Sequence, residues 1–203
     1  MPGERLKLFV TDTSPLITLA AAQSLDCLLY PGLPVVLPDA VFYEATASAD
    51  KLGAQEIVAW QRENAAQVTV APTRLFAAYV ERTESGGRYR EPDLGERAAL
   101  ELLRDTPLLG PGEKGLFLIE DGQLMTQHFL TADKERVIPI TTHDLLALLE
   151  EAHRIQSAAS ILARAREAGR TIRRYELYRE HPEEIRDAVR AVIERAHQRG
   201  DPG

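Results

Sequence analysis

Four carboxylates beside the ends of short apolar segments are the candidates for chemistry in this chain. They are Asp12, Glu44, Glu96 and Asp121. In parallel α/β sheets, ligands bind in the crevice outside such strand ends. Carboxylates gathered there would repel one another and raise one another's pKa, and a divalent cation removes that conflict. A set of oxygen ligands without histidine suits Mg²⁺ or Mn²⁺ rather than Zn²⁺, and such ions support in-line cleavage of phosphodiesters.

Asp12 ends an apolar, strand-like run over residues 6–11 and stands at a strand-to-helix junction. Ser14 is a good helix N-cap, and Pro15 behind it suits the first helical position. We therefore expect Ser14 to cap the helix, which leaves the Asp12 carboxylate free for a site. The alternative is that Asp12 is placed there only by capping and the helix dipole.

Glu44 follows Val41 by three residues in a helix predicted to open at Asp39, so it lies on or beside the buried stripe of that helix. An ordinary surface glutamate remains the alternative. Glu96 precedes an apolar stripe and is expected to point toward the core or a crevice. A first-turn glutamate favoured by the helix dipole is the alternative for Glu96. Asp93 is a reserve candidate or the cap of this helix, and Glu101 is expected on the solvent side without a special role.

Asp121 closes the apolar run over 116–119 and is followed by Gly122. An ordinary Asp-Gly turn would explain this pair equally simply. Glu120 could also take the place of Asp121, because neighbouring residues of a strand point to opposite faces and the register is open.

The elements that must position these residues alternate along the chain. This alternation favours a parallel sheet covered by helices on both faces. Strands are predicted at 6–11, 34–37, 68–70, 116–119 and 137–140, a turn-rich loop at 109–115, and helices at 15–29, 39–48, 53–65, 74–82, 95–104, 123–131, 145–166, 171–179 and 182–198.

The composition sets limits on the class of protein. The chain of 203 residues is 44% hydrophobic and has a net charge of −7, which argues against a nonspecific binder of polyanions. No run is long and apolar enough for a membrane helix or a signal segment, and the single cysteine, Cys27, excludes an internal disulfide. We therefore expect a cytoplasmic protein. Gly86 and Gly87, flanked by arginines, could form a loop that faces RNA, although a solvated linker is the simpler interpretation.

Taken together, four segments resemble the PIN-domain nucleases, especially the toxins of bacterial and archaeal toxin–antitoxin pairs and their uncharacterised relatives. The segments are residues 11–19, 37–44, 94–102 and 118–121. The resemblance implies a three-layer α/β/α domain with a central parallel sheet. It also implies cleavage of RNA that depends on Mg²⁺ or Mn²⁺, commonly by a homodimer, and an antitoxin protein as a possible partner.

By this resemblance, Asp12, Glu44, Glu96 and Asp121 are the catalytic and metal-binding acids, in that order along the chain. Thr13 and Ser14 match the small polar residues beside the first acid, which can bond a carboxylate or a metal-bound water. The segment after Asp121 departs from the basic or aromatic stretch usual in the family. We expect the PIN-like domain to span 1–165 and a C-terminal helical extension to span 166–203.

Two functions of different classes follow. The first is a metal-dependent endoribonuclease, acting as a toxin or in RNA processing, which requires the four acids to converge. The second is a catalytically inactive PIN-like interaction module, which predicts scattered carboxylates or no affinity for metal. A phosphatase on the same kind of sheet is less favoured, because position 14 is serine where an Asp-x-Asp pair would be needed.

Overall fold

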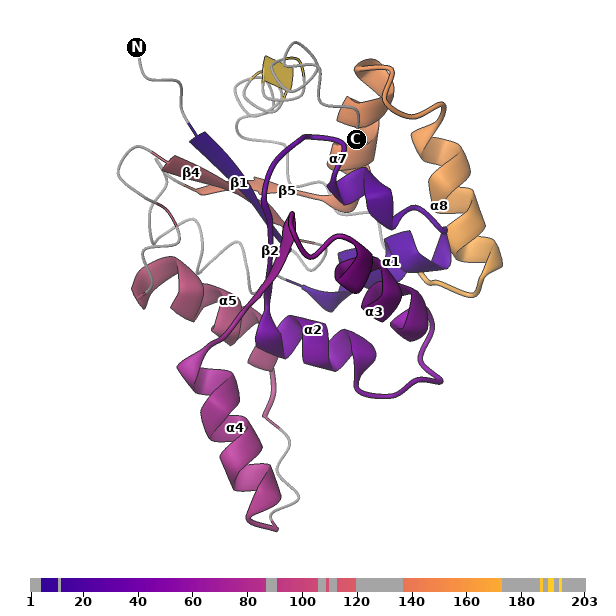
Figure 1. Cartoon of the computed structure of the whole chain (residues 1–203). Coiled ribbons are helices and arrows are strands. Elements are labelled where there is room, and N and C mark those ends of the chain that lie inside the picture. Colours follow the sequence, from indigo (N-terminus) through magenta and orange to yellow (C-terminus); the bar gives the residue numbers. More distant parts are fainter. Residues whose placement is uncertain are drawn as a thin grey trace.

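A single five-stranded parallel sheet forms the centre of the protein in a computed structural model (Figure 1). The structure describes residues 5–10, 12–86, 91–105, 109, 113–119 and 137–172, together with 187, 190, 191 and 194. The strands lie in the order β3-β2-β1-β4-β5. Their bounds are β1 Arg5–Val10, β2 Val35–Pro38, β3 Val68–Ala71, β4 Glu113–Leu118 and β5 Val137–Ile140.

Alternating side chains of the strands divide the core into two layers. Val35 and Leu37 of β2 join one hydrophobic cluster with Leu116 of β4, whereas Val36 and Phe117 belong to a second cluster. All five side chains are buried, as expected for a parallel sheet that is covered on both faces.

Helices cover both faces of this sheet (Figure 1). The first cluster packs the sheet against α1, α3, α7 and α8, and the second packs it against α5. The helices are α1 Thr13–Ala21, η1 Leu25–Leu28 (a 3-10 turn), α2 Asp39–Thr46, α3 Ala54–Glu63, α4 Arg74–Glu84, α5 Leu94–Asp105, α7 Thr142–Glu151 and α8 Ala158–Glu167. The predicted three-layer α/β/α fold with a central parallel sheet is confirmed.

The strand order reverses direction between β1 and β4. The chain runs outward from β1 to β2 and β3, and then returns to place β4 on the other side of β1. The carboxyl ends of β1 and β4 meet there, with Val10 opposite Leu118. This is the topological switch point, where open α/β sheets bind ligands.

Two predicted helices are wrong in length because each is interrupted. The helix expected over 15–29 ends at Ala21, since Gln23 takes a left-handed backbone with φ of 53°, and the 3-10 turn η1 follows. The helix expected over 145–166 is divided into α7 and α8. His153 is left-handed there, with φ of 56°, and Ser157 caps α8 by accepting a hydrogen bond from the Ser160 backbone.

The loop predicted over 109–115 is also partly wrong, because β4 begins at Glu113. Pairing with β1 extends this strand backward through Lys114, whose partner is Leu6, and Lys7 forms an ion pair with Glu113 at 3.0 Å. The sequence of β4 begins with polar residues, so its hydrophobic pattern alone did not mark this part as a strand. The helices predicted at 123–131, 171–179 and 182–198 fall wholly or largely outside the described residues.

Helix α8 and the residues directly after it are bound to α1 by two arginines. The Arg164 side chain donates to the Ala22 carbonyl at 3.1 Å, and Arg170 donates to the buried Thr18 hydroxyl at 3.2 Å. The predicted boundary between a domain at 1–165 and an extension at 166–203 falls inside α8. This division stays a prediction. In the part of the chain that the structure describes, no helix has the length and hydropathy to cross a membrane.

Gly53 lets α3 pack closely on α1, and its replacement tests this packing. It has φ of 79°, and a Cβ there would lie 2.5 Å from the Ala20 Cβ. We expect Gly53→Ala to lower the free energy of unfolding by about 2–4 kcal/mol, because backbone strain and overlap add. Gly169→Ala is the control: its φ is 92° but its surroundings are open, so only about 1–2 kcal/mol should be lost. Equal losses in urea unfolding would show that the Ala20 contact does not matter.

Candidate active site

Asp12 lies at the carboxyl end of β1 and caps α1. Its Oδ1 atom accepts a hydrogen bond from the Ser14 backbone at 3.1 Å, and the Thr13 hydroxyl lies 3.4 Å from the same oxygen. The prediction that Ser14 caps this helix is therefore wrong: Asp12 is the N-cap and the helix starts at Thr13. Pro15 is tolerated in the first turn, where a missing N–H leaves no helical bond unmade.

The second oxygen of Asp12 has a different environment. Asp12 is 9% exposed, and among the described residues its Oδ2 atom is the buried side-chain oxygen without a hydrogen-bond partner. A buried polar atom left unpaired costs about 1–3 kcal/mol, and more when it carries charge. Capping therefore explains one oxygen of Asp12, and the other is left to interact with a donor or a cation.

Glu44 approaches this site from α2. Its half-buried carboxylate accepts a hydrogen bond from the Gly95 backbone N–H at the start of α5. Burial, followed by the negative charges of Asp12 and Asp93, raises the pKa of Glu44, while the Gly95 bond and Lys51 oppose the shift. Glu44 is thus a half-buried side chain held by the start of α5 rather than a freely solvated one, and its role in a site stays a prediction.

Gly95 has little space for a side chain. A Cβ there would lie 3.1 Å from both Glu44 Oε2 and Val41 Cγ2. The absence of a side chain therefore lets the N-terminus of α5 reach the Glu44 carboxylate, where the helix dipole favours negative charge. Sequence reasoning did not identify this role, although a glycine in the first turn of a helix was a possible signal.

Glu96 faces the same group of charges from α5. Burial, together with the charges of Asp12, Asp93 and Glu44, raises its pKa to about 7, and the bond to its own backbone opposes the shift. The negative charges of Asp12 and Glu44 thus act on the Glu96 carboxyl. Asp93, weighed in the sequence as a reserve acid or a helix cap, contributes charge to the cluster from a left-handed backbone with φ of 55°.

The donors are of the kind that a divalent cation binds, since an unpaired buried oxygen lies among other carboxylates, but the described side chains alone do not complete a site. Among the residues that the structure describes, no three Asp, Glu, His or Cys side chains form a group that could hold a metal ion. Asp121 and its alternative Glu120 lie outside the described residues, so their predicted place in the site is untested.

Three polar side chains, Asp39, Thr73 and Glu101, connect α2, α4 and α5 through hydrogen bonds. Glu44 lies on α2 and Glu96 on α5. Asp39, at the start of α2, accepts bonds from the Thr73 backbone at 2.8 Å and the Thr73 hydroxyl at 2.7 Å. Glu101 of α5 accepts from the backbone N–H groups of Arg74 and Leu75, at 2.8 and 2.9 Å. The expectation that Glu101 has no special role is wrong, because its carboxylate binds the free N-terminus of α4.

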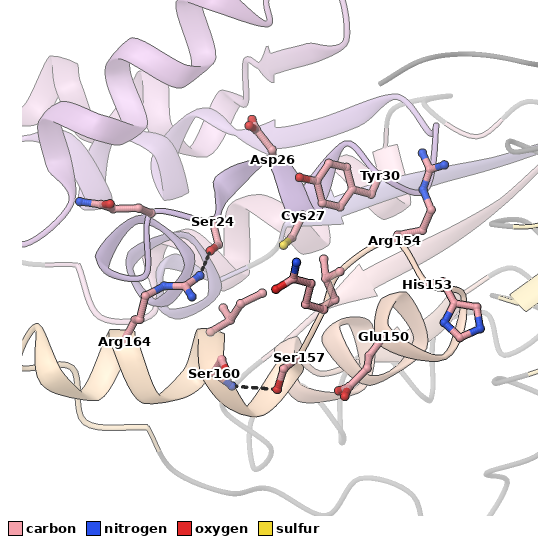
Figure 2. Close-up of a pocket in the computed structure, with 14 residues that line it drawn as sticks. Ser24, Asp26, Cys27, Tyr30, Glu150, His153, Arg154, Ser157, Ser160 and Arg164 are labelled. Atoms are coloured by element: carbon pink, nitrogen blue, oxygen red, sulfur yellow. Dashed lines mark hydrogen bonds between the residues drawn. The ribbon is translucent and has the colours of Figure 1, made fainter.

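A cavity of about 880 Å³ lies away from the carboxylates, between η1 and the α7–α8 connection (Figure 2). It borders the C-terminal end of α1, whereas Asp12 caps the N-terminal end. Polar groups around it already bind one another: Arg164 donates to Ser24 at 2.9 Å, and Ser157 accepts from the Ser160 backbone. Burial raises the pKa of the Cys27 thiol at its wall to about 11, so this thiol is not an activated nucleophile.

The raised pKa of Glu96 predicts that the metal-free protein loses stability as pH rises. The folded state favours the protonated carboxyl, so the stabilisation is complete below pH 4.5, the ordinary value, and is lost as pH rises through about 7. We expect Glu96→Gln to be more stable than wild type by about 1–2 kcal/mol at pH 8 in EDTA, after allowing for partial exposure. Near pH 4.5 this gain should disappear.

Urea unfolding at the two pH values, with the exposed Glu56→Gln of α3 as a matched control, measures this difference. The control should show the same stability relative to wild type at both pH values. A Glu96→Gln effect that does not change with pH would show that Glu96 is not perturbed by its neighbours.

Comparison with known proteins agrees with this geometry. Residues 8–107, which contain Asp12, Glu44 and Glu96, match a family model described as a PIN domain. Neither the curated proteins nor the solved structures contain a match to the chain. The PIN domain is a fold of the nuclease type, and PIN nucleases typically use divalent metals. Through residues 8–107, the chain matches the PIN-domain family.

Proposed function

We propose that the protein is an endoribonuclease that hydrolyses RNA phosphodiester bonds with Mg²⁺ or Mn²⁺. The observation that carries this proposal is the buried Asp12 Oδ2 atom, which has no hydrogen-bond partner among the described residues and lies at the switch point of the sheet. The negative charge of Asp12 contributes to the raised pKa of Glu44 and to that of Glu96. The PIN-domain family match supports the same conclusion.

Each acid has a distinct part in this proposal. Asp12 Oδ2, Glu44 and Glu96 would hold the ion, with Asp121 as the fourth ligand. Asp12 Oδ1 keeps its bond to the Ser14 backbone, so the carboxylate remains oriented while its second oxygen binds. When bound, the ion supplies activation of a water and neutralisation of charge on the phosphate. The Gly95 N–H fixes the direction of the Glu44 carboxylate.

Glu96 connects metal affinity with pH. With its pKa raised to about 7, it is partly protonated at neutral pH in the metal-free protein and must lose its proton to become a ligand. Metal binding should therefore release protons and strengthen as pH rises from 6 to 8.

The cellular setting is part of the proposal and rests on the resemblance to PIN-domain toxins. We propose a cytoplasmic homodimer that acts as a toxin or in RNA processing, with an antitoxin protein as its possible partner. The supporting roles of Thr13 and Ser14 beside Asp12 belong to the same proposal. So does the division into a PIN-like domain at 1–165 and a helical extension at 166–203.

Asp12→Asn provides the direct test. Asparagine keeps the cap of α1, because it is as good an N-cap as aspartate. The charge that should hold the ion is removed, so we expect calorimetry to show at least a roughly 10-fold weaker affinity for Mn²⁺. Cleavage of RNA should be lost both in this variant and in EDTA, while Glu56→Gln keeps both properties of wild type.

If wild type binds no Mn²⁺ and cleaves no RNA across a broad panel, the nuclease proposal fails. The inactive interaction module would then describe the protein better. If Mn²⁺ binds equally to wild type and Asp12→Asn, the ion is held elsewhere.

A second pair of variants distinguishes the two candidates for the fourth acid. We expect Asp121→Asn to reduce cleavage by at least roughly 100-fold and Glu120→Gln to leave it within about 3-fold of wild type. Rates under single turnover with saturating Mn²⁺ measure this difference. The opposite result would assign the role to Glu120.

A further inference from the structure

Three aromatic rings form a cluster where α4 meets α2. Tyr43 comes from α2, and Phe76 and Tyr79 come from α4. The ring centroids of Tyr43 and Phe76 are 5.1 Å apart, those of Phe76 and Tyr79 6.0 Å, and those of Tyr43 and Tyr79 6.2 Å. We call these three residues the aromatic cluster.

The aromatic cluster is open to solvent on one side. Tyr43 is 41% exposed, which is unusual for a large apolar side chain in the described part of this chain. Phe76 and Tyr79 are half-buried over a small core of Ala40, Leu94 and Ala98. Helix α4 projects away from the sheet and has no fully buried residue (Figure 1). Part of the ring surface is therefore available to a ligand.

The aromatic cluster adjoins the carboxylates through the contact between α2 and α5. On α2, Ala40 and Glu44 are one turn apart and so lie on the same face. Ala40 packs with Leu94 beneath the rings, while Glu44 accepts a bond from Gly95. The rings and the acids are thus supported by neighbouring residues of the same two helices, and a chain bound at the acids can extend onto the rings.

Positive charge lies at the end of the cluster nearest the C-terminus of α4. Arg82 follows Tyr79 by about one helical turn. The Glu91 carboxylate pairs with Arg82 at 3.9 Å and also with Arg97 of α5. Two guanidinium groups therefore lie at one carboxylate here. Their positive charge complements a phosphate backbone.

We propose that the aromatic cluster is a base-stacking subsite for single-stranded RNA, with Arg82 and Arg97 facing the RNA backbone. The inference rests on the proposed nuclease function and names the form of its substrate. Aromatic side chains bind any base through its flat face. In a duplex these faces are covered by the neighbouring bases, so the subsite selects unpaired RNA.

The area of the cluster favours RNA over a protein partner. A stable protein interface buries about 800 Å² on each side, which is more than three partly buried rings offer. A single base needs only one exposed ring for stacking, worth about 1–3 kcal/mol. A second copy of the chain on this surface is therefore an outcome of the test.

The test measures binding of fluorescently labelled, short single-stranded RNA in EDTA. The Asp12→Asn protein is the parent, so that cleavage cannot interfere. We expect Tyr43→Ala to weaken binding about 10-fold and Tyr43→Phe to bind as the parent does, because stacking needs the ring and not the hydroxyl. An abasic oligonucleotide of the same length should bind the parent and Tyr43→Ala equally.

Leu52→Ala is the matched control, because Leu52 is 40% exposed and lies outside the aromatic cluster. It should bind RNA as the parent does. Tyr43→Ala should also keep the circular dichroism spectrum of the parent, since Tyr43 is 41% exposed and lies outside the buried core.

Several results would overturn the subsite. One is equal affinity of Tyr43→Ala and the parent for RNA. Another is a loss of affinity in Tyr43→Ala that is as large for abasic RNA as for normal RNA. A third is a change of oligomeric mass in Tyr43→Ala without any loss of RNA affinity. In each case the wild-type protein would still cleave RNA with Mn²⁺ if the proposed function holds. Absence of both cleavage and Mn²⁺ binding in wild type would instead refute the proposed function.

Discussion

The burial of like charges at one edge of the sheet is the constraint on which the site depends. Asp12 places one oxygen in a helix cap and leaves the other without a protein partner. Glu44 and Glu96 are directed toward it by α2 and α5, and the pKa of each is raised. The fold tolerates this repulsion because β2 and β4, which flank β1, are packed on both faces. The free energy of the core offsets a locally unfavourable arrangement that is suited to a cation.

The supporting polar contacts explain how the arrangement stays ordered. Thr73 binds Asp39, and Glu101 binds the start of α4, so α2, α4 and α5 are joined by side chains as well as by packing. Gly95 adds a backbone donor to Glu44 without adding bulk. These residues do no chemistry themselves, and they determine the direction from which Glu44 and Glu96 enter the site.

The sequence predicts the sheet well, because it follows from local patterns. Continuous apolar runs identify buried parallel strands, and Asp12 stands at the end of β1, whereas Glu44 and Glu96 lie on α2 and α5 and their role in a site stays a prediction. Local patterns fail where tertiary contacts decide. The start of β4 at Glu113 depends on pairing with β1, and the break at His153 depends on the packing of α7 and α8. Asp12 and Ser14 are both good caps, so the sequence did not distinguish them. The partners of Gly95 and Glu101 come from other helices and leave no periodic signal.

The attachment of α8 to α1 has a consequence for synthesis of the chain. Asp12 caps the start of α1, but the contacts at the far end and side of this helix are completed by Arg164 and Arg170, which bind Ala22 and Thr18. Strand β1 likewise pairs with β4, which comes about 100 residues later in the chain, so this pairing forms only after β4 has been made. Such long-range contacts form only when both segments have left the ribosome. Asp12 is therefore synthesised early, but the contacts that hold its helix and strand in place form late. The growing chain therefore carries Asp12 without its final surroundings until most of the protein has been translated.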